Sequence, residues 1–242
     1  MNRQGNTYTV LYSVGLVLIV GVVLSLVYQA LRPTQEENIA NDTRKQILAA
    51  ARLVPAEGES VSQLYDKSIV ESFIVNSKGE KIDSSVPAFS VNIAAQVKQS
   101  DYADRLLPVY VCKTSDGIKY ILPVYGAGLW GPIWGYIAFN SDGQSIYGAY
   151  FAHQGETPGL GAEIEKPAFS NQFEGKKIFN AEGNFASIAV VKAGQAPAGV
   201  EYVNAVSGGT ITSQGVQKML ANSLAPYAAF LKNLNNSDHE TE

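Results

Sequence analysis

The feature that most constrains the fold of this chain is a long uncharged segment near its N-terminus. Residues 8–31 (YTVLYSVGLVLIVGVVLSLVYQAL) contain no charged side chain over 24 consecutive positions. A helix of this length is about 36 Å long, which is enough to cross a hydrocarbon core of about 30 Å. We therefore predict one transmembrane helix, with residues 1–33 as a membrane anchor.

Two other interpretations of this segment are a buried core helix and a cleaved signal peptide. The run is long for a core helix, and the apolar part of a signal peptide spans only about 7–15 residues and ends in small residues at A-x-A spacing. Residues 27–32 (VYQALR) offer no such cleavage site. Charge does not settle the orientation, because Arg3 lies on one side while Arg32, Arg44 and Lys45 lie on the other.

The rest of the chain predicts an α+β domain with an antiparallel sheet and flanking helices. We expect Pro33 to end the span, residues 34–60 to form a connecting helix and residues 61–242 to form the globular domain. Turn sequences at residues 115–117 (SDG) and 140–143 (NSDG) predict two hairpins. A C-terminal helix is predicted from residue 210 to about 233, with a kink at Pro226. The predicted strands cover residues 69–75, 109–114, 118–124, 134–139, 145–152 and 187–192.

Composition excludes several functional classes. Apolar residues make up 46% of the 242 positions and charged residues 17%, which excludes a disordered chain. One cysteine, Cys112, excludes an intrachain disulfide framework and a cysteine-cluster metal site. The balance of 18 basic and 22 acidic residues argues against a nucleic-acid partner. We predict no metal site and no catalytic acid or base.

The string G-x-G-x-x-G occurs at residues 126–131, but its context does not suit a dinucleotide. A dinucleotide-binding loop opens a helix after a strand, whereas Pro132 and a strand-like run follow here. We therefore predict a glycine-rich turn between two strands.

Two glycines and several hydroxyl residues occur together where the C-terminal helix is predicted to begin. Residues 204–213 read NAVSGGTITS. Glycines permit a tight turn and close approach of a ligand, and the free N–H groups of a helix start suit a phosphate. Serine and threonine are also ordinary helix caps. From residue chemistry alone the ordinary cap is the simpler interpretation, and the phosphate site remains the alternative.

A second glycine-rich string follows the last predicted hairpin. Residues 155–164 read GETPGLGAEI. Its glycines would let the backbone lie flat against a ligand, and a plain connecting loop is the alternative.

Together the two strings resemble motifs of the FMN-binding domain family. The match is strongest to the NqrC branch, which belongs to sodium-translocating NADH:quinone reductases, followed by the RnfG branch, which belongs to Rnf-type electron transport complexes. Residues 207–212 (SGGTIT) are similar to the family string Ser-Gly-Ala-Thr-x-Thr, and residues 156–164 to E-x-x-G-L-G-x-E-[IV]. The Gly-Leu-Trp at residues 128–130, the Gly-Tyr at residues 135–136 and the single N-terminal span also match.

The resemblance implies that Thr210 receives FMN from a flavin transferase, through a phosphoester between the FMN phosphate and the threonine hydroxyl. Thr212 is the alternative acceptor. The remaining residues that it implies near the cofactor are Ser207, Gly208, Gly209 and Ile211 around the phosphate, and Thr157, Gly159, Leu160 and Gly161 around the ring or its side chain.

The resemblance also implies a place among the six subunits of a complex in the inner membrane. That complex oxidises NADH, reduces ubiquinone or menaquinone and exports sodium, and this chain would relay electrons on the periplasmic side. Two positions depart from the family pattern: Gly209 replaces an alanine, and Asn204 replaces an aspartate. The alternatives are an RnfG-type electron carrier and a non-enzymatic anchored scaffold that has lost its flavin.

Overall fold

The long apolar segment forms part of a single helix. The structure of the chain, a computed structural model, describes residues 5–239 and the side chains of residues 5–235. Helix α1 runs without interruption over Asn6–Ala50, and the chain divides into a first unit up to Thr43 and a compact unit from Arg44 onward. The outermost residues of the predicted anchor (1–4) and of the predicted domain (240–242) lie outside the described residues.

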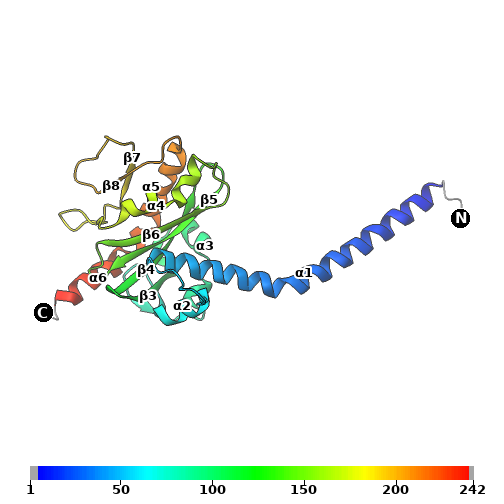
Figure 1. The fold of residues 1–242 in the computed structure, drawn as a ribbon, viewed down its shortest axis with the longest axis horizontal. Helices are drawn as coiled ribbons and strands as arrows, with labels where there is room; N and C mark the ends of the chain where they lie inside the picture. The colour runs from blue at the N-terminus through cyan, green and yellow to red at the C-terminus, as the bar shows by residue number, and fades with distance from the viewer. Residues whose placement is uncertain (1–4, 240–242) are drawn as a thin grey trace. The chain divides into compact units, whose positions relative to one another are not determined.

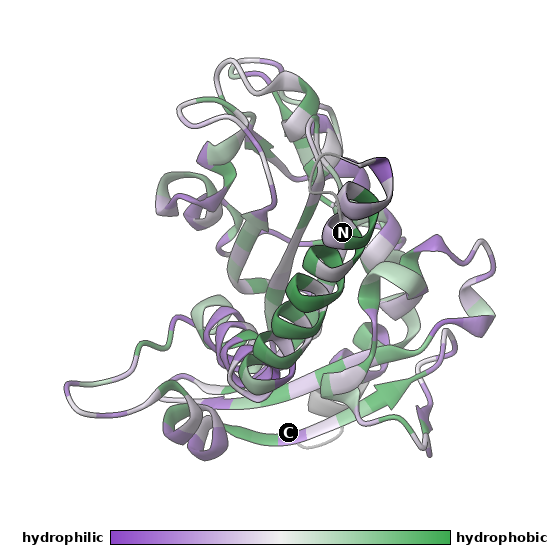
Figure 2. Ribbon diagram, turned by 90° about the vertical axis from the view of Figure 1, so that its right-hand side faces the viewer, coloured by the Kyte–Doolittle hydropathy of each residue, from purple (hydrophilic) through white to green (hydrophobic). Residues whose placement is uncertain are grey.

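The apolar part of α1 has the surface expected of a helix in lipid. None of its most hydrophobic 18-residue window is buried within the protein, and side chains such as Val17 and Ile19 are about two-thirds exposed, at 68% and 65%. Figure 2 shows these turns as hydrophobic ribbon. A continuous apolar surface of this size is unstable in water, and this observation supports the prediction that the helix is a membrane anchor.

Pro33, which we expected to end the span, does not end the helix, because α1 continues through this residue. A proline removes one backbone hydrogen bond and crowds the preceding turn, which can kink a helix without ending it. Figure 1 shows α1 as one helix. The helix ends at Ala50, before the predicted residue 60, and Arg52 follows in the left-handed region at φ 60°.

A six-stranded antiparallel sheet forms the centre of the compact unit (Figure 1). Its strand order is β2-β1-β3-β4-β5-β6. Both predicted hairpins are confirmed, since β3 pairs with β4 and β5 with β6. The strands are β1 (Ile69–Val75), β2 (Lys81–Ile82), β3 (Leu107–Thr114), β4 (Gly117–Ala127), β5 (Pro132–Asn140) and β6 (Ile146–His153).

Both faces of the sheet are buried, which makes it a rigid frame. On β5, Ile137 and Phe139 face a core built with the C-terminal helices, while Tyr136 and Ala138 face a second core that includes Ile47 at the end of α1. Alternate residues of a strand point to opposite faces, so one strand serves both cores. The helical segments are α2 (Val61–Ser68), η1 (Ala88–Ser90), α3 (Ile93–Lys98), η2 (Tyr102–Asp104), η3 (Gly161–Glu165), α4 (Pro167–Ser170), η4 (Asn171–Phe173), α5 (Thr210–Leu224), η5 (Ala225–Tyr227) and α6 (Ala228–His239).

The predicted kink at Pro226 is confirmed as the short turn η5 between α5 and α6. The strand predicted at residues 187–192 is confirmed as β7 (Ala189–Val191), but the sequence prediction missed its parallel partner, β8 (Tyr202–Asn204). A strand as short as β8 carries little periodicity, and only its pairing with β7 identifies it.

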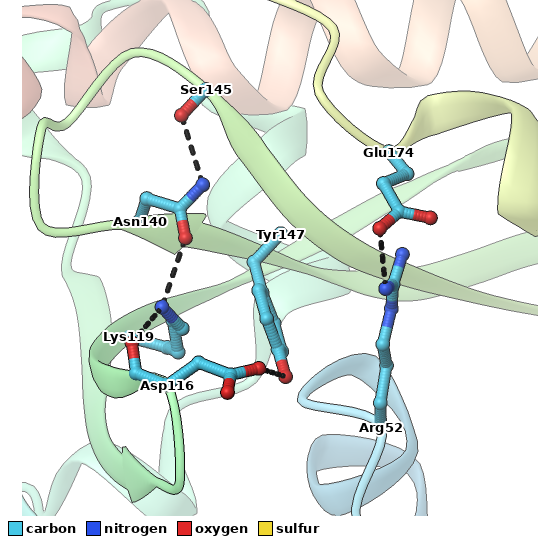
Figure 3. Close-up of polar contacts among 7 residues, drawn as sticks. All are labelled: Arg52, Asp116, Lys119, Asn140, Ser145, Tyr147 and Glu174. Atoms are coloured by element: carbon cyan, nitrogen blue, oxygen red, sulfur yellow. Dashed lines mark hydrogen bonds and ion pairs between the residues drawn. The ribbon is translucent and has the colours of Figure 1, made fainter.

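A polar cluster closes one end of the sheet (Figure 3). The Lys119 side chain is buried, and its Nζ donates to the Asp116 carbonyl oxygen at 2.7 Å and to Asn140 Oδ1 at 2.9 Å. The ring of Tyr147 covers the same ammonium at 4.4 Å, and its hydroxyl donates to Asp116 Oδ2 at 3.0 Å. A buried cation requires such partners, so this cluster has a structural role.

We predict that the Cys112 thiol is unreactive in the native chain. The side chain is fully buried, and burial raises the pKa of the thiol to about 11. Because the thiolate is the reactive form, alkylation by iodoacetamide at pH 8 should be at least ~100-fold slower in native than in denatured protein. Mass spectrometry measures the rate, and rapid alkylation of the folded chain would contradict the buried position.

Candidate functional site

The two motif strings and the β4–β5 turn surround one pocket in the compact unit. Its volume is about 340 Å³, within the range of small-molecule sites. The pocket brings together residues more than 80 positions apart in the sequence. Its lining is Leu129 and Trp130 from the turn, Glu156, Thr157, Leu160 and Gly161 from the loop after β6, and Gly208, Gly209, Thr210, Ile211 and Thr212 from the start of α5.

The start of α5 is not an ordinary hydroxyl cap. The N-cap residue is Gly209, and no side chain makes a capping hydrogen bond there. The N–H groups of the first helical turn therefore remain available to an anion, with the positive end of the helix dipole behind them. This arrangement favours the phosphate interpretation over the cap.

The two threonines of the T-x-T spacing point in different directions. Successive helical residues are rotated by about 100°, so positions two apart lie on nearly opposite sides. Thr210 is exposed in the pocket lining, whereas Thr212 is only 1% exposed and donates its hydroxyl proton to Glu156 Oε2. The next residue, Ser213, is also buried, and its Oγ accepts the Val206 N–H at 3.0 Å. Of these three hydroxyl residues in the first turn of α5, Thr210 is therefore the one exposed at the pocket.

Glu156 is a buried carboxylate that joins the three segments of the site. Its side chain accepts hydrogen bonds from the Thr212 hydroxyl on α5 and, at 2.8 Å, from the Trp130 N–H in the β4–β5 turn. Its own N–H donates to His153 Nδ1, at 3.1 Å, at the end of β6. The residue is 4% exposed, so these bonds satisfy a group that would otherwise be costly to bury.

Three glycines make this packing possible. A Cβ atom at Gly128 would lie 2.5 Å from Glu156 Oε1, and one at Gly161 would collide with both Glu156 Oε2 and Thr212 Oγ1. Gly208 has φ +72°, and a Cβ there would lie 2.5 Å from Leu160 Cδ2. Side chains at these positions would separate the walls of the site.

The outer walls of the pocket are apolar and exposed. Leu129, Trp130, Leu160 and Ile211 have exposed fractions of 47%, 68%, 43% and 54%. Four large apolar side chains around one opening are unusual on a water-exposed domain and indicate a ligand or partner surface. Their position beside a helix start suits a group with a flat apolar part and a phosphate.

The structure brings eight of the ten predicted site residues into this pocket. Gly159 and Ser207 line a neighbouring pocket of about 490 Å³, together with Asn204. The predicted glycine-rich turn is also confirmed, since residues 128–131 connect β4 to β5 and the Gly128 N–H donates to the Gly131 carbonyl oxygen at 2.8 Å. The string after β6 is not entirely loop, because the short helix η3 begins inside it at Gly161.

Sequence reasoning did not place Leu129, Trp130 or Glu156 among the site residues. All three stand in the motif strings, but their contacts depend on the approach of distant segments.

The turn before α5 is tightly packed at Gly209, one of the two positions that depart from the family pattern. At Gly209, a Cβ would lie 3.1 Å from Val206 Cγ1 and 3.3 Å from Gly161 Cα. The glycine therefore leaves no gap in the turn, and an added methyl group would be tightly packed.

Comparison with known proteins gives consistent matches. Residues 128–225 match the FMN-binding domain family. The chain is 35% identical to the C subunit of the Na(+)-translocating NADH-quinone reductase of Vibrio vulnificus, over 84% of this chain and 85% of that protein. It is 30% identical to the C subunit of the Chlamydia pneumoniae enzyme, over 96% and 93% of the two chains.

Solved structures of the same kind also match. The crystal structure of the C subunit of the Na(+)-translocating NADH-quinone reductase from Parabacteroides distasonis is 49% identical and superimposes with a TM-score of 0.76, covering 83% of this chain and 96% of that one. NqrC from Shewanella oneidensis is 25% identical, with a TM-score of 0.67 and coverages of 81% and 98%.

We predict that Gly161→Ala destabilises the domain by about 1–3 kcal/mol, because the added methyl group overpacks the contact between Glu156 and Thr212. Gly155→Ala in the same loop is the matched control. Its added methyl group meets nothing within 4 Å, and its φ is ordinary, so the free energy of unfolding should change by less than about 1 kcal/mol. Chemical denaturation followed by circular dichroism measures both variants. Equal stabilities would show that the space around Gly161 is not restricted.

Proposed function

Because the chain belongs to the NqrC family of Na(+)-translocating NADH-quinone reductase subunits, we propose that it carries FMN covalently on Thr210 and relays electrons between other subunits. The observation that carries the proposal is the uncapped helix start that presents the Thr210 hydroxyl in a pocket with exposed apolar walls. The chain would thereby contribute to NADH oxidation, quinone reduction and sodium export by the complex.

The residues of the pocket fit FMN in both its charge and its shape. The phosphate would bind the first-turn N–H groups of α5, where Gly208 and Gly209 allow close approach of the backbone. The apolar ring would lie against Leu160, Trp130 or Ile211, which are otherwise exposed to water. Thr157 and Gly161 also line this pocket.

Attachment requires a flavin transferase and an activated donor. A phosphoester does not form spontaneously from a free phosphate, so the FMN phosphate must come from an anhydride such as a flavin dinucleotide. The Thr210 oxygen replaces the anhydride oxygen on phosphorus, the hydroxyl proton passes to a base of the transferase, and a nucleoside monophosphate leaves. Thr212 is an unfavourable alternative acceptor, because its buried hydroxyl already donates to Glu156.

When bound, FMN supplies the capacity to accept and donate one or two electrons. The chain's own residues would hold the cofactor in place: the covalent bond at Thr210 prevents dissociation, and the apolar walls limit contact with water. No side chain in the pocket is needed as a catalytic acid or base.

We further propose that residues 1–33 anchor the chain in the inner membrane by one pass, that residues 34–60 link this anchor to the domain and that residues 61–242 lie on the periplasmic side. The partners would be the other members of a complex of six subunits, the lipid bilayer and the maturing transferase. Little free flavin is available outside the cytoplasm, which gives a covalent bond its advantage there.

Two alternatives differ from this proposal. The named relatives are all C subunits of NADH-quinone reductases, which favours the NqrC assignment over the RnfG type. An anchored scaffold without flavin would be consistent with the departures at Gly209 and Asn204. Asn204 is exposed at the end of β8, and its backbone N–H donates to Gln172 Oε1 at 2.8 Å, so this contact does not depend on the side chain.

We predict that Thr210→Ala abolishes covalent flavin, because it removes the only exposed threonine hydroxyl at the helix start. The full chain is coexpressed with a flavin transferase, and intact mass and in-gel fluorescence measure the attached FMN. Thr210→Ser is the matched control and should keep flavin, since it keeps a hydroxyl at the same position. Flavin retained by Thr210→Ala, or a colourless wild-type chain of unmodified mass, would contradict the assignment.

The relay itself is tested in the assembled complex. A complex that carries Thr210→Ala should still oxidise NADH with an artificial acceptor at the NADH site, but its NADH-dependent quinone reduction should fall at least ~100-fold, because the path between subunits is interrupted. Stopped-flow absorbance and quinone-reductase assays measure the two activities. Unchanged quinone reduction would show that electrons bypass this chain.

A further inference from the structure

We propose that Glu156 is a positioning residue whose buried carboxylate holds the first turn of α5 so that the Thr210 hydroxyl faces the pocket. The inference deepens the proposed function and rests on attachment at Thr210. It assigns Thr212 a role as the partner of Glu156.

The burial of Glu156 is explained by its partners. The carboxylate is 4% exposed and is bound by the Thr212 hydroxyl and the Trp130 N–H. It also lies at the N-terminal end of a 15-residue helix, where a negative charge is favourable. Charge-assisted hydrogen bonds of this kind are about twice as strong as neutral ones, so the contact can fix the orientation of the segments that it joins.

Because of the helical rotation, the contact at Thr212 determines the side of α5 on which Thr210 lies. Because α5 has no side-chain cap, its first turn depends on the bonds made by Thr212 and Ser213. Thr210 is about 200° around the helix from Thr212. When Thr212 is bound to Glu156 on the inner side, Thr210 therefore lies on the outer side. Without the Glu156 contact, the first turn would be free to fray or rotate, as uncapped helix ends do.

Glu156 also ties the helix start to the rigid sheet. Its N–H binds His153 Nδ1 at the end of β6, and its carboxylate binds the turn between β4 and β5. The hydroxyl that accepts the phosphate and Trp130 on the opposite wall are therefore held by the same side chain. A reactive group positioned in this way reacts faster, because less orientational freedom is lost in the reaction.

The test measures flavin attachment to the full chain in the presence of a flavin transferase. Glu156→Ala and Thr212→Val should each lower the initial rate of attachment by about tenfold or more. The double variant should be no slower than the slower single variant, since both remove the same contact. Thr212→Ser keeps the hydroxyl and should restore the rate to near that of the wild type.

Ser223→Ala provides the matched control for loss of a buried hydroxyl in α5. Ser223 is buried and exchanges hydrogen bonds with the Tyr125 backbone at 3.1 and 3.2 Å. It lies about 16 Å along the helix from Thr212, so its removal should leave the rate of attachment unchanged. An equal loss of rate in this variant would show a general effect of stability and would overturn the positioning role.

A second measurement does not depend on flavin. In the full chain produced without the transferase, Glu156→Ala should increase amide hydrogen exchange at least ~10-fold both in residues 128–131 and in residues 209–213, whereas Ser223→Ala should change neither. Unchanged exchange in both segments would overturn the inference. If the wild-type chain never acquires FMN, the proposed function fails, and the exchange result still decides whether Glu156 holds the two segments. Thr212→Val keeps the shape of threonine and provides the same test if Glu156→Ala does not fold.

Discussion

The candidate site depends on one buried interaction, the contact of the Glu156 carboxylate with the Thr212 hydroxyl and the Trp130 N–H. These groups come from three segments that are distant in sequence, and a carboxylate withdrawn from water requires donors from its surroundings. Glycine is required at positions 128 and 161, because a methyl group at either Gly128 or Gly161 would collide with this carboxylate. The glycines and the glutamate therefore form one structural unit, although they occur in separate motifs.

The sheet provides the frame on which this unit is built. Its two faces are covered by separate cores, and α5 approaches the β4–β5 turn closely because Gly215 has no side chain to separate it from the Ala127 carbonyl oxygen. Close packing of this kind resists small displacements. This packing holds the body of α5 against the sheet, whereas the orientation of its uncapped first turn, which carries Thr210, depends on the Glu156 contact.

Much of the fold could be predicted from local signals. The hairpins at residues 115–117 and 140–143 follow from turn chemistry, and the membrane anchor follows from the uncharged run. The errors occurred where local signals compete with context. Pro33 lies inside α1 and does not end it, and neither β8 nor its parallel pairing with β7 has a turn or periodicity that could identify it. Long-range pairing is decided by the packing of the whole domain, which a local pattern does not contain.

For the site, the sequence by itself determined the residue types: two glycines and a T-x-T spacing at a helix start, a second glycine-rich string, and the family to which they are similar. Only the tertiary structure decided how the two threonines differ. Thr212 lies inside against Glu156, and Thr210 lies outside in the pocket. The reason is physical: hydroxyl groups two residues apart on a helix face opposite sides, and which side is buried depends on the distant carboxylate that packs against it.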